Sequence, residues 1–243
     1  MNDRKNCRVV WITGGTKGLG LALVEHFAGE GCQVIATYGS DDYAACRLRS
    51  RLSVDVIKAD VRDETALQAV ADEIADRYGH LDVLINNAGI GLTGSVEQVS
   101  AQQFCDVIDV NVTGKYRCIR VALPLLRKSE YGCIVNVASA SGVNASDFMS
   151  AYCVSASAIL MLTKCAAKDL SVWKIRVNAV SPSMMECGIA QRCFSQEDRD
   201  LVRSLNPMKR LGTSEDSVNC IAWLCSKQST YINGENILLT GGK

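Results

Sequence analysis

Proline and histidine are scarce in this chain of 243 residues, and the chain has no net charge. It has three prolines and two histidines, and its 26 basic residues balance its 26 acidic ones. A neutral chain has no electrostatic reason to bind nucleic acid or an anionic membrane, so neither is expected as a partner. Few prolines, no internal repeat and no low-complexity linker indicate a single domain over residues 1–243.

The sequence also lacks the spacing that metal sites and disulfide frameworks require. Its only histidines are His26 and His80, and none of its twelve cysteines belongs to a C-x-x-C pair. A set of zinc ligands is therefore not visible, and no metal is predicted. The cysteines are scattered from Cys7 to Cys225, several inside apolar runs, and we interpret them as reduced, small, buried residues of a cytosolic protein.

A signal peptide or membrane anchor is not visible near the start of the chain. The first apolar stretch, Val9 to Ile12, has four residues, which is too short for either. Together with the reduced cysteines, this predicts a cytoplasmic location.

Short apolar runs alternate with longer segments of helical periodicity along the whole chain. In one such segment, Leu67, Val70, Ile74 and Tyr78 recur at a helical spacing. The apolar runs are typical of strands that are buried on both faces, which occur in parallel sheets. Strands are predicted at 8–13, 32–37, 54–59, 81–86, 133–139, 175–181 and 236–240, and helices at 17–30, from about 42, at 64–79, 101–128 and 214–226, and around Tyr152.

This alternation of strands and helices predicts the fold class. Each return to the sheet requires a right-handed crossover through a helix, so the strands run parallel. The expected fold is α/β: a single-domain, doubly wound Rossmann fold with a seven-stranded parallel sheet flanked by helices. In such a fold the ligand binds at the carboxyl ends of the strands.

The first predicted strand ends in the glycine-rich stretch "TGGTKGLG". Gly14, Gly18 and Gly20 let the backbone turn sharply, approach a pyrophosphate and pack the helix against the sheet. The helix N-terminus then presents free N–H groups to the phosphates. A glycine triplet alone also fits a tight turn without a ligand, but its position between a strand and a helix favours nucleotide binding. The predicted cofactor loop also contains Thr16, Lys17 and Leu19.

Two further strand ends carry polar residues that are consistent with a nucleotide site. Asp60 follows the third strand, and its carboxylate can accept a hydrogen bond from an adenine amino group. The stretch "NNAG" ends the fourth strand, where the side-chain amides of Asn86 and Asn87 can tie neighbouring strands together and Gly89 leaves room for a ribose. Each stretch alone is also consistent with an ordinary loop turn. The predicted cofactor contacts here are Asp60, Val61, Asn87, Ala88 and Gly89.

The charges near the second strand favour NADP over NAD. An NAD site places a carboxylate at the end of this strand for the ribose 2′-hydroxyl, and Tyr38 stands there. Asp41 and Asp42 follow a few residues later, where they are better placed to begin the next helix. Lys17 can instead meet a 2′-phosphate. The hydroxyls expected to help it are those of Thr37 or Ser40.

Three polar residues complete this ordered set of motifs. Ser139 ends the fifth predicted strand, Tyr152 stands thirteen residues later, and Asn111 lies in "DVNVTG". Together with "TGGTKGLG", "NNAG", "IRVNAVSP" and "YINGENILLTGG", these positions resemble the short-chain dehydrogenase/reductase family, including its 3-oxoacyl-carrier-protein reductases. The resemblance extends over nearly the whole chain. It is highly specific for the family and far less so for the substrate.

The resemblance implies a role for each of these side chains. In the family, a serine orients the carbonyl or alcohol, a tyrosine transfers the proton and an asparagine holds a water of the proton relay. These roles fall on Ser139, Tyr152 and Asn111. A lysine four residues after the tyrosine binds the nicotinamide ribose and lowers the tyrosine pKa, and its place is taken by Ala156. The resemblance also assigns Pro182 and Met185 to the cofactor site.

Ala156 shares a helix face with Tyr152 but offers neither a charge nor a donor. Free tyrosine has a pKa of about 10, and a nearby ammonium would favour its ionisation. Without one, the proton step and the cofactor grip are both expected to weaken, with a loss on the order of 10²–10⁴ in rate. Lys164 lies about 18 Å farther along the helix and cannot reach. Lys115, one turn after Asn111, is expected to point elsewhere.

Two explanations of Ala156 stay open at this point: an engineered replacement of the lysine, or a natural loss. The otherwise intact motif favours engineering or a modified chemistry. Two further departures favour natural divergence, because Ser183 replaces the glycine of the family's "PG" and Cys187 replaces its threonine.

Residues 183–207 fall where the family has its substrate lid. Met184, Met185, Ile189 and Phe194 offer an apolar wall there. A loop that merely covers exposed core is an equally good interpretation.

The expected function is NADP-dependent hydride transfer between a nicotinamide and an apolar ketone or 3-oxoacyl substrate, impaired by Ala156. One alternative is a nucleotide-binding scaffold or sensor without turnover. Another is a non-redox reaction, such as dehydration, at the same site. From the resemblance, a homodimer or homotetramer is expected.

Overall fold

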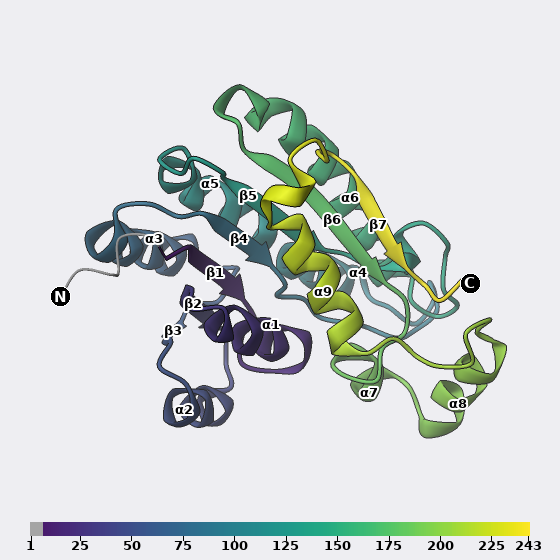
Figure 1. Ribbon diagram of the computed structural model, residues 1–243. Helices are drawn as coiled ribbons and strands as arrows, with labels where there is room; N and C mark the ends of the chain where they lie inside the picture. The colour runs from purple at the N-terminus through teal and green to yellow at the C-terminus, as the bar shows by residue number, and fades with distance from the viewer. Residues whose placement is uncertain (1–6) are drawn as a thin grey trace.

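Seven strands form one parallel sheet in the computed structural model, which describes residues 7–243 (Figure 1). Their order across the sheet is β3-β2-β1-β4-β5-β6-β7. Each strand begins and ends within about two residues of its predicted bounds, so the predicted fold class is confirmed. The strands are β1 (Val9–Thr13), β2 (Gln33–Tyr38), β3 (Asp55–Lys58), β4 (Val83–Asn86), β5 (Cys133–Val137), β6 (Arg176–Pro182) and β7 (Asn236–Leu239).

The strands are apolar because the sheet is covered on both faces. All residues of β1 and β4 are buried. Successive side chains of a strand point to opposite faces. Trp11 therefore packs into one core cluster, and its neighbour Ile12 packs into the other.

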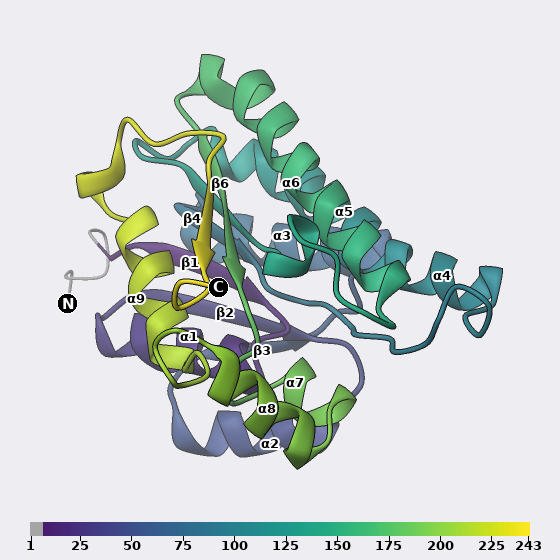
Figure 2. The same cartoon turned by 90° about the vertical axis from the view of Figure 1, so that its right-hand side faces the viewer.

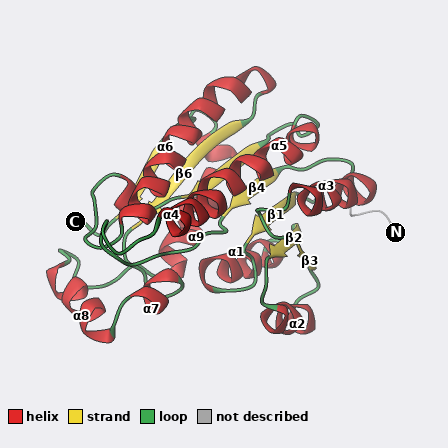
Figure 3. Ribbon diagram, turned by 180° about the vertical axis from the view of Figure 1, so that it is seen from behind, coloured by secondary structure: helices red, strands yellow, loops and turns green. Residues whose placement is uncertain are grey.

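Helices form a layer on each face of the sheet (Figures 1 and 3). On one face, Phe27 of α1 and Leu48 of α2 join the same core cluster as Ile221 of α9. On the other face, α3, α5 and α6 share the second cluster, and α4 packs against α6. The helices of these two layers are α1 (Gly18–Gly29), α2 (Asp42–Arg51), α3 (Glu64–Tyr78), α4 (Ala101–Ile108), α5 (Gly114–Leu126), α6 (Ser150–Leu170) and α9 (Ser214–Leu224).

Several of these helices begin at a capping side chain. Asp41 and Asp63 accept a backbone N–H of the first turn of α2 and α3, and Ser100 and Thr213 do the same for α4 and α9. α1 differs, because its N-cap residue Lys17 makes no such hydrogen bond. The first N–H groups of α1 are therefore not capped by that side chain.

The long helix predicted at 101–128 is continuous, but a π-helical turn lies within it. α4 ends at Ile108, the π turn covers Asp109–Thr113, and α5 continues from Gly114. A π turn widens one turn of a helix, and such turns occur frequently at functional sites. This one contains Asn111, which the sequence had already singled out.

The chain crosses to the other half of the sheet between β3 and β4. From β1 the strands extend outward to β3, and the chain then returns to place β4 on the other side of β1. The helices that follow β1 and β4 lie on opposite faces, which opens the ligand crevice of a doubly wound sheet. Two short helices, α7 (Ile189–Cys193) and α8 (Gln196–Leu205), lie at this end of the molecule (Figures 1 and 2).

The cysteines are all free thiols from residue 7 onward, but the expectation that they are buried holds for only three of them. The others lie on helix faces or loops with at least partial access to solvent. The buried three are Cys118, Cys133 and Cys225, and the fully exposed three are Cys46, Cys105 and Cys165.

α6 and the turn after it form the only helical segment among residues 7–243 that is long and apolar enough to cross a membrane. The fold explains this composition. α6 packs against β6, and its residues Ala156, Ile159 and Ala166 are buried. A core helix that covers a sheet is apolar for this reason, so the segment is a weak indication of membrane contact.

Candidate active site

A cavity of about 1070 Å³ opens at the carboxyl ends of the strands. Its walls come from the glycine loop, the ends of β2 to β6, the π turn, α6 and the segment before α8. Most of the residues singled out from the sequence line it together, and Thr37 and Gly20 do not. The lining residues among them are Gly14, Thr16, Lys17, Gly18, Leu19, Ser40, Asp60, Val61, Asn87, Ala88, Gly89, Asn111, Ser139, Tyr152, Ala156, Pro182 and Met185.

The glycine loop is shaped to receive an anion. Gly14 and Gly18 have φ angles of 65° and 51°, which glycine adopts without strain. A Cβ on Gly20 would lie 2.1 Å from the carbonyl oxygen of Gly14, so the helix can approach the loop only with glycine there. Because Lys17 does not cap α1, the first N–H groups of this helix can bind phosphate oxygens. These residues therefore fit the pyrophosphate of a dinucleotide.

The loop after β4 is fastened to the strands on both sides. The amide of Asn86 donates to Oδ1 of Asn136 on β5 at 2.9 Å. The amide of Asn87 donates to the carbonyl oxygens of Thr13 and Gly14 at 3.0 and 3.1 Å. The prediction that these two amides tie neighbouring strands together is confirmed.

The ends of β2 and β3 bring charged groups to the cavity. Lys17 forms an ion pair with Asp41, whose carboxylate also caps α2 as expected. The Lys17 ammonium and the backbone of α2 hold the pKa of Asp41 below its usual value. The guanidinium of Arg62 donates to both oxygens of Asp60, at 3.0 and 2.7 Å, and lowers the pKa of that carboxyl. Asp60 is therefore an ionised acceptor at neutral pH.

Thr37 does not have the position that the sequence led us to expect. Its side chain is fully buried inside the sheet, and its hydroxyl accepts a hydrogen bond from the indole N–H of Trp11 at 3.1 Å. The hydroxyl is therefore not available to a phosphate. Ser40, the other hydroxyl proposed to assist Lys17, does line the cavity.

Ser139 and Tyr152 come together from two different elements. Ser139 follows β5, and its Oγ accepts the backbone N–H of Ser141 at 3.2 Å where a 3₁₀ turn begins. Tyr152 lies in the first turn of α6 and lines the same cavity as Ser139, whose side chain is near enough to act on the pKa of the phenol. Burial raises the pKa of Tyr152, and the nearby Ser139 hydroxyl opposes this rise. The phenol is therefore protonated at neutral pH and can act as a proton donor.

Comparison with known proteins agrees with this geometry. A family profile described as enoyl-(acyl carrier protein) reductase matches residues 14–243. The meso-2,3-butanediol dehydrogenase of Serratia marcescens is 34% identical over 239 residues, which cover 97% of this chain and 94% of that protein. The chain belongs to the short-chain dehydrogenase/reductase family.

Two further relatives have the same extent. The 3-oxoacyl-(acyl-carrier-protein) reductase of Staphylococcus aureus is 31% identical over 236 residues, which cover 95% of this chain and 96% of that protein. The ligand-free aldohexose dehydrogenase of Thermoplasma acidophilum has a TM-score of 0.89 at 29% identity, covering 98% of this chain and 94% of that one. Short-chain dehydrogenases/reductases are oxidoreductases that use nicotinamide cofactors.

The asparagine of the short-chain dehydrogenase/reductase pattern supports the loop after β4. Oδ1 of Asn111 accepts the backbone N–H of Ile90 at 2.8 Å, and its amide donates to the Ile90 carbonyl at 2.9 Å. The same amide donates to Oγ of Ser155 at 3.0 Å, which joins the π turn to α6. Ser155 was not singled out from the sequence, because a serine on a helix carries no signal of its partner.

The position of Lys115 contradicts the expectation that its side chain points away from the site. It is buried, and its ammonium donates to the carbonyl oxygens of Asn86 and Ala88 at 3.0 and 2.7 Å. It lines the cavity, as Ala156 does. A lysine on a helix usually extends to solvent. Its burial here depends on two backbone carbonyls that no sequence pattern locates.

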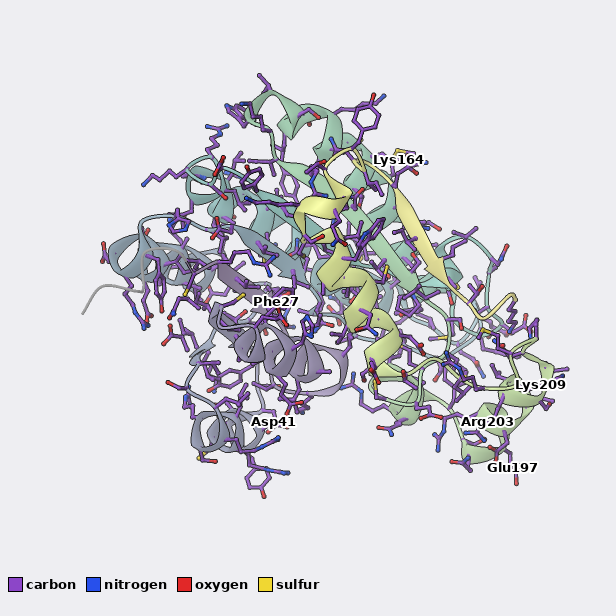
Figure 4. The ribbon with its side chains drawn as sticks, in the orientation of Figure 1. Phe27, Asp41, Lys164, Glu197, Arg203 and Lys209 are labelled. Atoms are coloured by element: carbon purple, nitrogen blue, oxygen red, sulfur yellow. The ribbon has the colours of Figure 1, made fainter. Side chains whose placement is uncertain are left out.

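Lys164 is exposed and does not line the cavity, as its distance along the helix predicted. In Figure 4 it lies toward one end of the molecule, far from the labelled Glu197 and Arg203 of α8. Its ammonium therefore does not replace the lysine expected at position 156.

The segment at 183–207 folds into two short helices against the open side of the cavity. Its apolar residues Met184, Met185, Ile189 and Phe194 all line the cavity. Cys187, which replaces the family's threonine, lies with its sulfur 3.1 Å from Oγ of Ser214. That thiol is therefore engaged with the start of α9.

The close approach of α1 to the glycine loop is tested by two alanine substitutions on the same helix. In Gly20→Ala, the new Cβ meets a backbone carbonyl at 2.1 Å. We expect a lower melting temperature and at least about tenfold weaker dinucleotide binding. In Gly29→Ala, the Cβ meets no atom within 4 Å, so stability should rise by up to about 1 kcal/mol. Thermal denaturation and a fluorescence titration with NADPH measure both effects. Equal behaviour of the two variants would show that the packing at position 20 is not required.

Proposed function

We propose that the protein is an NADP-dependent oxidoreductase that interconverts a ketone and a secondary alcohol. The observation that supports this most is a single cavity bordered both by the glycine loop and by the side chains of Ser139 and Tyr152. A dinucleotide with its pyrophosphate at α1 and its adenine near Asp60 extends its nicotinamide toward this pair. When bound, this cofactor supplies or accepts a hydride at the carbonyl carbon.

Two hydroxyls serve the oxygen of the substrate. Ser139 keeps its Oγ at the end of β5 through the bond from the Ser141 backbone, so its hydroxyl can orient a carbonyl. Tyr152 is protonated at neutral pH and donates its proton as negative charge develops on that oxygen. Donors that are already aimed at this oxygen need no reorganisation during the reaction. In the reverse direction the phenolate must accept the proton.

With alanine at position 156, alcohol oxidation is expected to be slower than ketone reduction. No ammonium is among the groups that shift the pKa of Tyr152, and burial raises this pKa. The phenolate is therefore rare at neutral pH, and alcohol oxidation should accelerate as the pH rises toward the raised pKa. Ketone reduction uses the protonated phenol, so its rate should stay constant until the pH approaches that same pKa.

Ala156 also favours a second candidate function, that of a nucleotide-binding scaffold or sensor without turnover. The cavity has the features that bind a dinucleotide, but no ammonium is among the groups that shift the pKa of Tyr152, so proton transfer lacks that assistance. A dehydration at the same hydroxyls, without hydride transfer, is a third possibility that the same experiment distinguishes.

The cavity wall favours a substrate with an apolar body and a carbonyl head. Four large apolar side chains line the same cavity as Tyr152. They are Met149, Met184, Ile189 and Phe194. A small hydroxyketone or a 3-oxoacyl group fits this description, and the names of the relatives include a butanediol dehydrogenase and a 3-oxoacyl reductase. We propose that residues 183–207 act as the substrate lid.

The preference for NADP rests on the charges at the end of β2. Lys17 is half-exposed beside the cavity, and its partner Asp41 is a surface carboxylate that also caps α2. A 2′-phosphate can compete for the Lys17 ammonium, because surface ion pairs are weak. Tyr38 offers no carboxylate to a ribose hydroxyl, and its own hydroxyl donates to Asp42 at 3.0 Å.

Exposed apolar residues favour assembly into a dimer or tetramer. Tyr116 is exposed on α5. Val154 and Met161 on α6 and Val172 just after it are also exposed, and they recur at steps of about two and three helical turns. We propose that α5 and α6 form a subunit interface, and that the protein is cytoplasmic.

The catalytic proposal is tested by assaying three variants with a panel of ketones. Ala156→Lys should raise the reductase rate on the order of 10²–10⁴, because an ammonium beside Tyr152 supports the proton step. Tyr152→Phe should abolish turnover while dinucleotide binding persists. Arg47→Met, on the exposed side of α2 and away from the cavity and the proposed subunit interface, should match the unmodified protein. NADPH absorbance measures the rates.

The outcomes of this assay separate the three candidate functions. Turnover that rises in Ala156→Lys supports the oxidoreductase. Tight NADPH binding without turnover in either form supports the scaffold. Product without NADPH oxidation supports dehydration.

The cofactor preference is tested at the ion pair. Lys17→Ala should raise the Michaelis constant for NADPH about tenfold or more and leave that for NADH nearly unchanged, because only NADPH has the 2′-phosphate. Asp41→Asn should lower the constant for NADPH, since asparagine still caps α2 but frees Lys17. If both variants affect NADH and NADPH equally, the NADP preference is wrong.

The assembly is tested by Met161→Glu, which places a charge on the exposed apolar side of α6. Light scattering after size exclusion should give a smaller mass for this variant than for the unmodified protein. Tyr43→Glu on α2 is the control, because this residue is 74% exposed outside the proposed interface. An unmodified protein of monomeric mass would contradict the proposal.

A further inference from the structure

Lys115 is a buried cation that has no carboxylate partner among residues 7–243. Its exposed fraction is 3%, and its ammonium is held by the carbonyl oxygens of Asn86 and Ala88. It takes part in none of the ion pairs of residues 7–243. Taking an ammonium out of water is unfavourable unless other groups compensate for its lost hydration. Two neutral carbonyls compensate only in part, so this cation gains from any further acceptor.

The ammonium has a donor to spare, and it lies at the cavity. A lysine ammonium has three N–H donors, and the carbonyls of Asn86 and Ala88 use two of them. Lys115 lines the cavity together with Ala88 and Gly89. From α6, Ala156 brings only a methyl group to the same cavity. The remaining N–H of Lys115 is therefore a cationic donor that is available to a ligand in the cavity beside Ala88 and Gly89.

The part of a dinucleotide that meets this wall follows from its covalent order. The pyrophosphate lies at the start of α1, and the nicotinamide lies beside Tyr152 in the proposed function. The ribose that joins them must pass the loop after β4, where Gly89 leaves room for it. Its hydroxyls are acceptors, and a charge-assisted hydrogen bond to them is stronger than a neutral one.

We propose that Lys115 donates its third N–H to a hydroxyl of the nicotinamide-side ribose and so anchors the dinucleotide from α5. This inference rests on the proposed function, because it requires a bound dinucleotide. Lys115 takes over the grip on the ribose that the resemblance assigns to a lysine at position 156. It does not take over the effect on the proton donor, because Lys115 is not among the groups that shift the pKa of Tyr152. In the family, one lysine binds the ribose and lowers the tyrosine pKa. In this chain Lys115 performs the first task only.

The protonation state of Lys115 agrees with this role. Burial lowers the pKa of Lys115 to about 8, so it is largely charged at pH 7. Among the titratable side chains from residue 7 onward, only Cys118 on the same helix opposes this shift, and no side chain of β4, α4 or α6 contributes. Dinucleotide affinity should therefore be highest below this pKa and fall as the pH rises through about 8.

The test measures dinucleotide binding rather than turnover. Lys115→Gln keeps two N–H donors for the carbonyls of Asn86 and Ala88 but removes the charge and the third donor. Lys115→Met removes all of them. Isothermal titration of both variants with NADPH at pH 7 and pH 9.5 is compared with that of the unmodified protein and of the exposed-site control Arg47→Met on α2, and thermal melting reports the fold.

We expect the dissociation constant of Lys115→Gln at pH 7 to rise about tenfold to a hundredfold, with an unchanged melting temperature. The unmodified protein should lose affinity at pH 9.5, and Lys115→Gln should not. Adding Ala156→Lys should restore affinity to Lys115→Gln and change the unmodified protein less, because both lysines then serve one ribose.

Two results would overturn the inference in different ways. If the unmodified protein binds NADPH and Lys115→Gln binds it equally well at both pH values, Lys115 only ties α5 to the loop after β4. If the unmodified protein binds neither NADPH nor NADH, the proposed function fails and this inference fails with it.

Discussion

The loop after β1 and the loop after β4 approach each other so closely that their contact determines the geometry of the whole cavity. The amide of Asn87 bridges to the carbonyls of Thr13 and Gly14, and a Cβ on Gly14 would lie 3.0 Å from the Cα of Ala88. The same contact fixes the start of α1, where we propose that the phosphates bind, and the carbonyls that accept hydrogen bonds from Lys115. The phosphate end and the chemical end of the cavity therefore depend on one backbone arrangement.

The two lysines of the cavity work in different electrical surroundings. Lys17 is half-exposed and already paired with Asp41, so water screens its charge and a phosphate must compete for it. Lys115 is buried, unpaired with any carboxylate of the described chain and close to neutral carbonyls, so its field is screened much less. In the proposed function, Lys17 discriminates between cofactors and Lys115 holds the cofactor that has entered. Burial raises the pKa of Tyr152 and so keeps its phenol protonated, and neither lysine is among the groups that shift this pKa.

The sheet and the glycine loop were predictable because both leave local signals. Buried strands are short apolar runs, and the turn before α1 needs glycine at defined positions such as Gly14 and Gly18. Ser139 and Tyr152 were found through a family pattern of ordered motifs. These signals are read from residues close together in sequence, and the sheet then brings their sites together.

The rest of the site depends on contacts between distant residues, which no local pattern encodes. Lys115 is held at the cavity because two carbonyls at the end of β4 accept hydrogen bonds from its ammonium. Thr37 faces away from it because Trp11, a neighbour across the sheet, takes its hydroxyl. The π turn around Asn111 interrupts a helix whose periodicity gave no warning of it. Burial of nine cysteines was overestimated because apolar flanking residues do not tell which side of a helix meets the core.

The order of strands across the sheet also determines how the chain can assemble while it is being made. β1 lies between β2, its neighbour in sequence, and β4, which begins at Val83, about seventy residues after β1 ends at Thr13. At about 5–20 residues per second, a ribosome needs several seconds to supply that missing partner. Until then β1 keeps an open edge of unpaired N–H and C=O groups, a template to which other chains can add. Nascent chains are therefore most prone to aggregate in that interval, before the centre of the sheet closes.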